Sequence, residues 1–172
     1  MNLDSVCESL RKASRILEGL SAQQKNECLN QVAKALDENR ASIIAANKID
    51  VDAARKNGVS DSIIDRLTLN DSRIDGIIEG LRSVISQTDP IGEETGGWKT
   101  PNGLTIRQVR VPLGVVAIIY ENRPNVTVDA FCLAYKSGNA ILLRGSSSSY
   151  NSNLEIVRVI KQALAGCANT PA

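Results

Sequence analysis

Apolar residues recur at helical spacing through the first half of the chain. The clearest stripe has apolar side chains at positions 74, 77, 78, 81, 84 and 85, which fall on one face of a helix. Ser21 and Asn70 stand where helix N-caps are expected, and Gly58 stands where a left-handed C-cap is expected. The pattern predicts that residues 1–88 form a helical segment whose apolar stripes are buried against other elements.

Local signals also predict where some helices of this segment begin and end. Asp4 precedes the first apolar-periodic positions, so we expect it to cap the first helix. The apolar residues between Ile43 and Ala46 predict a short helix, and residues 48–56 predict another.

The pattern changes at residue 89. Prolines and glycines without periodicity predict a loop over residues 89–103. Residues 104–111 alternate between apolar and polar, which predicts a half-exposed strand, and one break in the alternation indicates a bulge. Residues 115–120 are almost uniformly apolar, which is typical of a parallel strand covered on both faces.

A second strand and two helices complete the pattern. A helix is predicted from about Val126 to Lys136, then a buried strand over 140–143, then a last helix opened by Asn151 or Ser152. Strand, helix, strand and helix in this order predict a parallel unit with a right-handed crossover. Residues 166–172 contain no pattern for the next strand, so we expect a truncated fold.

The predicted fold class is therefore α/β, in three parts. Residues 1–88 are a helical N-terminal segment, 89–103 a loop, and 104–172 the incomplete start of a parallel Rossmann-like cofactor-binding domain.

Composition and charge exclude several classes of function. The chain has 20 basic and 19 acidic residues with no basic cluster, so we expect no nucleic-acid partner. No apolar run approaches the ~20 residues that cross a bilayer, so we expect no membrane association. The polar N-terminus lacks the apolar stretch of a signal peptide, which predicts a cytoplasmic location.

The cysteine and histidine content narrows the chemistry. Cys7, Cys28, Cys132 and Cys167 form no CxxC pair, and the chain has no histidine. No metal site is expected from these residues, and a catalytic unit built on imidazole is excluded.

Candidate chemistry lies where the two predicted parallel strands end, because ligands of such sheets bind beyond the carboxyl ends of the strands. One end is the segment 119–125 and the other is 143–149. Each precedes a helix whose first backbone N–H groups attract anions. Arg144 and the four following serine hydroxyls are either a phosphate site or a solvated turn with a surface arginine.

Two sequence runs resemble a known family. The run RVPLGVVAIIYENRPNVTVDAF and the later run KSGNAILLRGSSSSYNSN are similar to those of the γ-glutamyl phosphate reductase (glutamate-5-semialdehyde dehydrogenase) family, a branch of the aldehyde dehydrogenase superfamily. The likeness extends over essentially all 172 residues, including the helical segment. It implies an aldehyde-dehydrogenase-type fold and NADP(H) as cofactor.

The resemblance also implies a reaction and residue roles. The reaction is NADPH-dependent reduction of L-glutamyl 5-phosphate to L-glutamate 5-semialdehyde in proline biosynthesis, through attack of a cysteine thiolate on the acyl carbon. Asn122 or Asn125 would stabilise the oxyanion, and Arg123 would bind the substrate's phosphate or carboxylate, or be paired on the surface. The implied cofactor-binding residues are Ile119, Tyr120, Glu121, Arg144, Gly145, Ser146 and Ser147.

None of the four cysteines matches the family's nucleophile, so this chain is predicted to be inactive alone. The run Cys167-Ala168-Asn169-Thr170 is superficially similar to a catalytic motif, but it follows the last predicted helix too early in the fold. The resemblance further implies a small-molecule substrate, a homo-oligomer at full length and a pathway link to glutamate 5-kinase. The alternative is a non-catalytic remnant that binds nucleotide or pairs with another chain.

Overall fold

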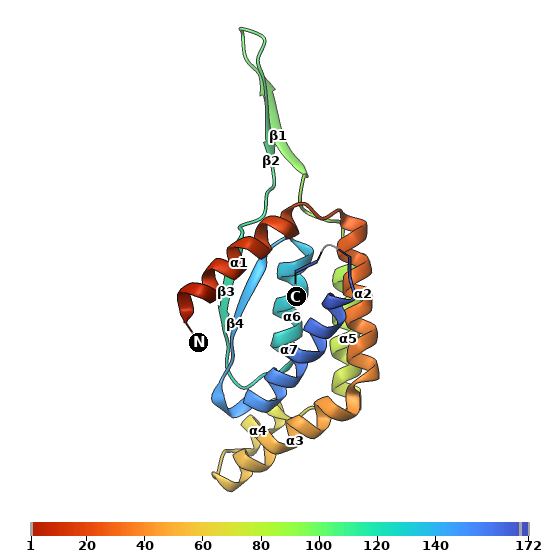
Figure 1. Ribbon diagram of the computed structural model, residues 1–172, viewed down its shortest axis with the longest axis vertical. Coiled ribbons are helices and arrows are strands. Elements are labelled where there is room, and N and C mark those ends of the chain that lie inside the picture. Colours follow the sequence, from red (N-terminus) through yellow and green to blue (C-terminus); the bar gives the residue numbers. More distant parts are fainter. Residues whose placement is uncertain (1, 169, 172) are drawn as a thin grey trace.

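The computed structural model describes residues 2–168 and 170–171, and it consists of a helical body from which one hairpin projects (Figure 1). Its elements in chain order are α1 (Leu3–Glu18), α2 (Ala22–Glu38), α3 (Arg40–Lys56), α4 (Asp61–Leu67), α5 (Asp71–Ser86), β1 (Glu94–Lys99), β2 (Thr105–Val109), β3 (Val115–Ile119), α6 (Asn125–Lys136), β4 (Ala140–Arg144), a 3₁₀ turn (Ser147–Ser149) and α7 (Tyr150–Ala165).

The N-terminal segment is helical, and its caps follow largely from local sequence. Ser21 and Gln24 form a reciprocal capping box at the start of α2, and the Asn70 side chain accepts from the Arg73 N–H at the start of α5. The expected Asp4 cap is wrong, because Asn2 accepts the Asp4 N–H and Asp4 occupies the first turn. The apolar stripe of α5 is buried where this helix packs against α2 and α6.

The two short helices expected over residues 43–56 are wrong, because α3 is one continuous helix of 17 residues. Its polar positions Asn47 and Asp50 interrupt the apolar pattern, yet both side chains are buried. Asn47 bonds the Leu67 carbonyl oxygen at 2.8 Å and accepts the Leu69 N–H at 2.7 Å. Tertiary hydrogen bonds thus place these polar residues inside, where periodicity alone suggests a break.

β3 and β4 form the expected parallel pair, with Val115 opposite Ala140 and Ile119 opposite Arg144. Both α1 and α6 pack against this sheet (Figure 1). The expectation that β3 is covered on both faces is wrong for this chain, since Val115 and Ile119 are exposed. Among the described residues β4 is the sole strand hydrogen-bonded to β3, so the other edge of β3 has no neighbouring strand there.

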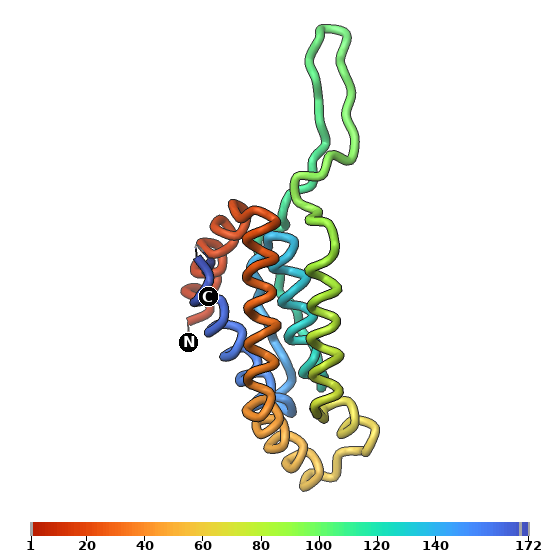
Figure 2. The backbone as a smooth tube through the Cα atoms, turned by 90° about the vertical axis from the view of Figure 1, so that its right-hand side faces the viewer, coloured from red at the N-terminus to blue at the C-terminus, as the bar shows by residue number. Residues whose placement is uncertain are grey.

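The loop expected over residues 89–103 is wrong for residues 94–99, which form β1 and pair antiparallel with β2. The two strands form the hairpin that extends away from the helices (Figure 2). Gly97 lies so close to β2 that a Cβ atom there would be 2.7 Å from the Ile106 carbonyl oxygen. The glycines that suggested a loop therefore allow close approach of two strands.

The break in the alternation of residues 104–111 does correspond to a register irregularity, but this lies on the partner strand. The pairing of Glu94 with Val109 and of Gly96 with Gln108 leaves one extra residue, Thr95, in β1.

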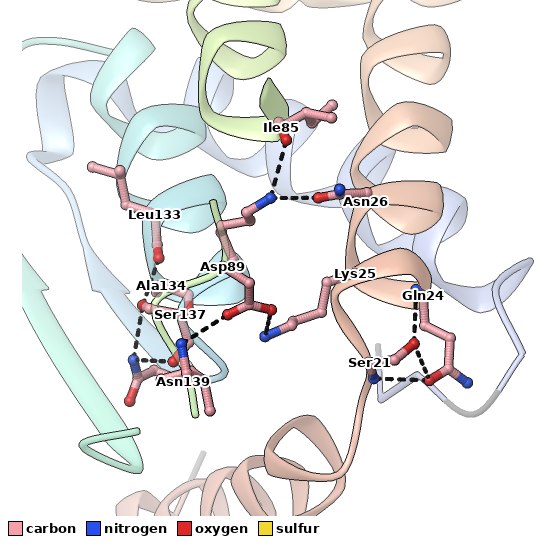
Figure 3. Close-up of polar contacts among 12 residues, drawn as sticks. Ser21, Gln24, Lys25, Asn26, Ile85, Asp89, Leu133, Ala134, Ser137 and Asn139 are labelled. Atoms are coloured by element: carbon pink, nitrogen blue, oxygen red, sulfur yellow. Dashed lines mark hydrogen bonds and ion pairs between the residues drawn. The ribbon is translucent and has the colours of Figure 1, made fainter. Parts of the chain in front are cut away.

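A buried ionic cluster ties α2 and α6 to the segment that follows α5 (Figure 3). Lys25 is 2% exposed and pairs with Asp89, while Lys136 is 4% exposed and donates to Asn26 Oδ1 at 2.6 Å and to the Ile85 carbonyl oxygen at 3.0 Å. Burial lowers the pKa of Lys136, and the nearby Asp89 carboxylate partly offsets this. The Asp89 carboxylate thus pairs with Lys25, while neutral oxygens of Asn26 and Ile85 accept from Lys136, where three elements meet.

No helix within residues 2–168 and 170–171 combines the length and apolarity that a membrane span requires.

Candidate functional site

The two expected ligand-binding segments form one continuous edge, because β3 and β4 run side by side in parallel. The Tyr120 backbone N–H donates to the Arg144 carbonyl oxygen at 3.1 Å, which extends the pairing beyond Ile119. Both carboxyl ends lie at the end of the body where α3 and α4 are found, opposite the hairpin (Figure 1). The loop before α6 and the turn before α7 therefore lie next to each other.

A directed chain of hydrogen bonds fixes this edge. Thr127 Oγ1 donates to Asn153 Oδ1 at 3.0 Å, so its single proton is used and the Tyr120 hydroxyl must donate to Thr127, at 2.7 Å. Asn153 Nδ2 then donates to Ser149 Oγ at 3.0 Å, and Ser149 Oγ donates to the Ser146 carbonyl oxygen at 3.3 Å. Burial raises the pKa of Tyr120, which keeps its phenol a donor. The chain links the ends of both strands through α6 and α7.

Sequence reasoning missed Thr127 and Asn153, and it included Ser149 only as one of four turn hydroxyls, although these three residues hold the site residues in place. All three lie within the two runs that carry the family resemblance. A signal was available at Thr127, because a hydroxyl on the inward face of an otherwise apolar helix requires a partner.

The N-terminus of α7 is fixed from a distant part of the chain. The carboxylate of Asp50 on α3 accepts the backbone N–H of Asn151 at 3.2 Å and that of Ser152 at 2.8 Å. Asn151 and Ser152 were expected to open this helix, but it begins at Tyr150 with no side-chain cap of its own. The helical segment therefore supplies the cap, and so positions the turn that precedes α7.

The turn after β4 combines one cation with several hydroxyls. Arg144 is exposed, makes no ion pair among residues 2–168 and 170–171, and donates from Nη1 to the Gly145 carbonyl oxygen at 2.9 Å. The Ser146 hydroxyl accepts the Ser148 backbone N–H at 3.2 Å, so it caps the 3₁₀ turn. Ser147 is exposed. The turn thus presents a guanidinium and an exposed serine to solvent beside a helix N-terminus.

The two asparagines of the Glu-Asn-Arg-Pro-Asn run differ in their partners. Asn125 Nδ2 donates to Asp129 Oδ2 at 3.1 Å. Asn122 makes no side-chain hydrogen bond within the described part of the chain, although its Oδ1 atom is buried. A buried polar atom without a hydrogen-bond partner is unusual in folded proteins, so Asn122 is a candidate for a functional contact.

A pocket of about 540 Å³ opens between α4, the start of α5 and the start of α6. The charged and polar side chains that line it include Asp65, Arg66, Arg73, Arg123, Asn125 and Asp129. Arg123 was expected to meet the substrate, but the contribution of α4 and α5 was not foreseen. Arginines on the polar face of a surface helix are indistinguishable, by pattern alone, from an ordinary solvated face.

The cysteines lie apart from this edge and do not line the pocket. Burial, with the Asp129 charge adding to it, raises the pKa of the Cys132 thiol to about 11. Burial, with Cys28 adding to it, raises the pKa of Cys167 to about 12. Asn169 of the Cys-Ala-Asn-Thr run lies outside the described residues. Within the described residues no group of three or more Cys, Asp or Glu is arranged to hold a metal ion.

Comparison with known sequences places this geometry in a family. The profile described as the aldehyde dehydrogenase family matches residues 1–169. The chain belongs to the aldehyde dehydrogenase family. The expected fold class is thereby confirmed: a helical N-terminal portion followed by a short parallel sheet of the aldehyde dehydrogenase type.

Within the aldehyde dehydrogenase family, the expected resemblance to γ-glutamyl phosphate reductases is confirmed. Proteins of that name from Thermobifida fusca and Geobacillus thermodenitrificans are 54% and 53% identical to the chain, over 93% and 91% of its length. The crystal structure of the γ-glutamyl phosphate reductase from Thermotoga maritima superposes with a TM-score of 0.92 at 47% identity, covering 95% of this chain and 39% of that one. The chain spans about 38% of the length of the two curated relatives.

Proposed function

We propose that this chain is part of a γ-glutamyl phosphate reductase, which uses NADPH to reduce L-glutamyl 5-phosphate to L-glutamate 5-semialdehyde in proline biosynthesis. One observation carries the proposal: relatives of that name align with 157 to 160 of the 172 residues at 53–54% identity, and so include both strand-end segments. In the net reaction the bond between the acyl carbon and the phosphate oxygen breaks, phosphate leaves, and hydride is added to the carbon.

Asn122 is the proposed oxyanion-stabilising residue, in preference to Asn125. An oxyanion needs an N–H donor that is free in the ground state. The Asn125 amide already donates to Asp129, whereas that of Asn122 has no hydrogen-bond partner in the part of the chain that the structure describes. Asn122 lies within the strand-end segment 119–125, in the region where ligands of parallel sheets bind.

The strand ends are the proposed binding edge for NADP(H) within residues 104–172. The residues present are compatible with a nucleotide phosphate, since Arg144 supplies an exposed cation and no carboxylate occurs between residues 144 and 149. A carboxylate there would repel a ribose 2′-phosphate, so its absence favours NADP(H) over NAD(H). When bound, NADPH supplies the hydride. The proposed binding residues are Ile119, Tyr120, Glu121, Arg144, Gly145, Ser146 and Ser147.

The nucleophilic thiolate of the reaction is proposed to come from none of the four cysteines. Raised pKa values of about 11 for Cys132 and about 12 for Cys167 keep both thiols protonated at neutral pH. Cys7 and Cys28 lie on α1 and α2 and do not line the pocket. We therefore expect no turnover from the 172 residues by themselves.

Further proposals concern the setting of the enzyme. A small-molecule substrate accords with the family. A cytoplasmic location, assembly into a homo-oligomer and a link to glutamate 5-kinase are proposed from the family resemblance, and the lability of an acyl phosphate favours the kinase as a neighbour.

The test is to express the natural coding sequence that contains this chain and to assay the reverse reaction. We expect oxidation of L-glutamate 5-semialdehyde that requires inorganic phosphate and is faster with NADP⁺ than with NAD⁺. Activity on simple aldehydes alone would assign another substrate within the family. Absence of turnover, together with nucleotide binding, would favour the non-catalytic alternative.

A further inference from the structure

The pocket beside α4 contains charged groups that the proposed reaction has not yet used. Arg73 is already satisfied within the fold, because its Nη2 atom lies 2.7 Å from Asp65 Oδ1 and its Nη1 atom donates to the Thr68 carbonyl oxygen at 2.7 Å. These contacts hold the end of α4 against the start of α5. The pair of Arg73 and Asp65 is therefore internally neutral and serves the architecture.

Three other charged groups of the pocket remain. Arg66 and Arg123 make no ion pair among residues 2–168 and 170–171, and neither does Asp129. Arg66 comes from α4, Arg123 from the loop after β3 and Asp129 from α6. Two unpaired cations and one unpaired carboxylate thus line one pocket from three different elements.

Asp129 is the least expected of these groups. Its Oδ2 atom accepts a hydrogen bond from Asn125, but its partly buried carboxylate makes no ion pair among the described residues. Burial raises the pKa of this carboxyl group, which reflects the cost of keeping its charge there. A cationic ligand group would offset that cost, because an opposite charge stabilises a partly buried carboxylate.

We propose that this pocket binds the α-amino-acid end of the substrate, with the α-ammonium group at Asp129 and the α-carboxylate at Arg123 and Arg66. The proposal rests on the proposed function, in which the substrate is a glutamyl derivative. Asn122 precedes Arg123 in the chain, about 3.8 Å away between Cα atoms. Asn122 itself does not line the pocket, so the acyl end of a ligand held by Arg123 would have to extend out of the pocket toward the segment that carries Asn122.

A phosphate group is a poorer occupant of the same pocket. The arginines would attract it, but Asp129 would repel a dianion held at Arg123, and no cation among the described residues neutralises Asp129. A zwitterion matches both signs at once. Inorganic phosphate is accordingly included among the probes, and competition by phosphate would reverse the assignment.

The experiment titrates the 172-residue chain with L-glutamate, with two analogues that each lack one charged α-group and with inorganic phosphate, and it uses NMR chemical shifts as the readout. L-Glutamate carries both α-groups, glutarate lacks the ammonium, and 4-aminobutyrate lacks the α-carboxylate. The variants are Arg123→Gln and Asp129→Asn, the second of which keeps an acceptor for Asn125. The matched controls are Arg82→Gln and Glu79→Gln, two exposed α5 residues that do not line the pocket.

We expect L-glutamate to bind at least about tenfold more tightly than either truncated ligand, since each lost charge-assisted contact has about that effect. Arg123→Gln should weaken L-glutamate and glutarate but leave 4-aminobutyrate nearly unchanged. Asp129→Asn should weaken L-glutamate and 4-aminobutyrate but leave glutarate nearly unchanged. Both control variants should bind like the wild type.

Equal binding of all three ligands, or equal effects of both variants on all of them, would overturn the proposal. The proposal would also be overturned if the unsubstituted chain showed a cooperative thermal transition, and so was folded, but did not bind L-glutamate. These outcomes are separate from the proposed function, whose test is turnover of the semialdehyde. A protein that turns over the semialdehyde while the chain fails to bind L-glutamate refutes only the pocket assignment.

Discussion

Tyr120 and Gly145 lie in contact across the ends of the two parallel strands. A Cβ atom built at Gly145 would lie 3.1 Å from Tyr120 Cζ and 3.2 Å from its hydroxyl oxygen, and closer still to Asn153 Nδ2. Tyr120 and Asn153 are the two side chains that Thr127 joins in the hydrogen-bond chain. Gly145 is therefore required by close packing of side chains against its Cα atom, since its backbone has no left-handed φ.

Gly145→Ala is expected to destabilise the fold by about 1–3 kcal/mol, because overpacking must displace Tyr120 or Asn153. The matched control is Gly80→Ala on α5, where a Cβ atom meets nothing within 4 Å. That variant should be stabilised by about 0.4–1 kcal/mol, as expected for alanine in an exposed helix. Urea denaturation of both variants measures the two effects. Equal behaviour of the two variants would mean that the site tolerates a methyl group.

Removing the Asp89 carboxylate, which pairs with the buried Lys25, should be far more damaging. Asp89→Asn leaves Lys25, which is 2% exposed, without its ionic partner, so we expect a loss of about 3–5 kcal/mol. Glu94→Gln in the exposed pair with Arg107 should cost under about 1 kcal/mol. Combining Lys25→Met with Asp89→Asn should recover part of the loss. If the double variant is no more stable than Asp89→Asn, the buried charge is not the cause.

Acid stability should depend on Glu155. Its carboxylate accepts two hydrogen bonds from Arg158, at 2.7 and 2.8 Å, and this guanidinium, with the Ser42 hydroxyl, lowers the pKa of Glu155 to about 2 from an ordinary 4.5. A carboxyl group with a lowered folded-state pKa contributes stability that is fully present above its unfolded-state pKa. That contribution is lost as the pH falls from about 4.5 to about 2.

The comparison of wild type with Glu155→Gln tests this sign directly. Their difference in unfolding free energy should be constant above about pH 5 and should vanish near pH 2, measured by denaturation across that range. Glu8→Gln, in an exposed pair with Lys12, should change the free energy by under about 0.5 kcal/mol. A difference that grows on acidification would contradict the assigned direction.

Local signals predicted most of the helices and both parallel strands, because caps and periodicity depend on near neighbours. Ser21 and Asn70 act as the caps that their residue types indicate. The signals were misleading where distant partners decide the outcome. Asn47 and Asp50 are polar positions inside α3 whose partners lie 20 to 105 residues away. The β1 strand was missed because its glycines serve strand contact and not a turn.

The candidate site was predictable as far as the strand ends, since parallel topology alone brings 119–125 and 143–149 together. The choice between Asn122 and Asn125 was not predictable, because it depends on which amide is already bonded. Nor was the pocket, whose charges come from α4 and α6, more than 50 residues apart in the chain. No local pattern distinguishes Arg66 or Asp129 from solvated surface residues.

Substitution of Asn122 should affect activity more than stability, and substitution of Asn125 should affect stability more than activity. Asn122→Ala removes a buried oxygen that has no partner in the described structure, so the unfolding free energy should stay constant or rise by up to about 1 kcal/mol. Asn125→Ala removes the bond to Asp129 and should lower it by about 1 kcal/mol.

In the protein encoded by the natural coding sequence, Asn122→Ala should be the variant with the larger loss of activity. Asn122→Ala should lower kcat by about 10²–10³, as loss of one oxyanion donor does, while Asn125→Ala should have a much smaller effect. Thermal denaturation and initial rates on the same pair of variants provide both readouts. If Asn122→Ala were the less stable variant and retained its kcat, the unpaired amide would be a packing element, and Asn125 would become the candidate donor.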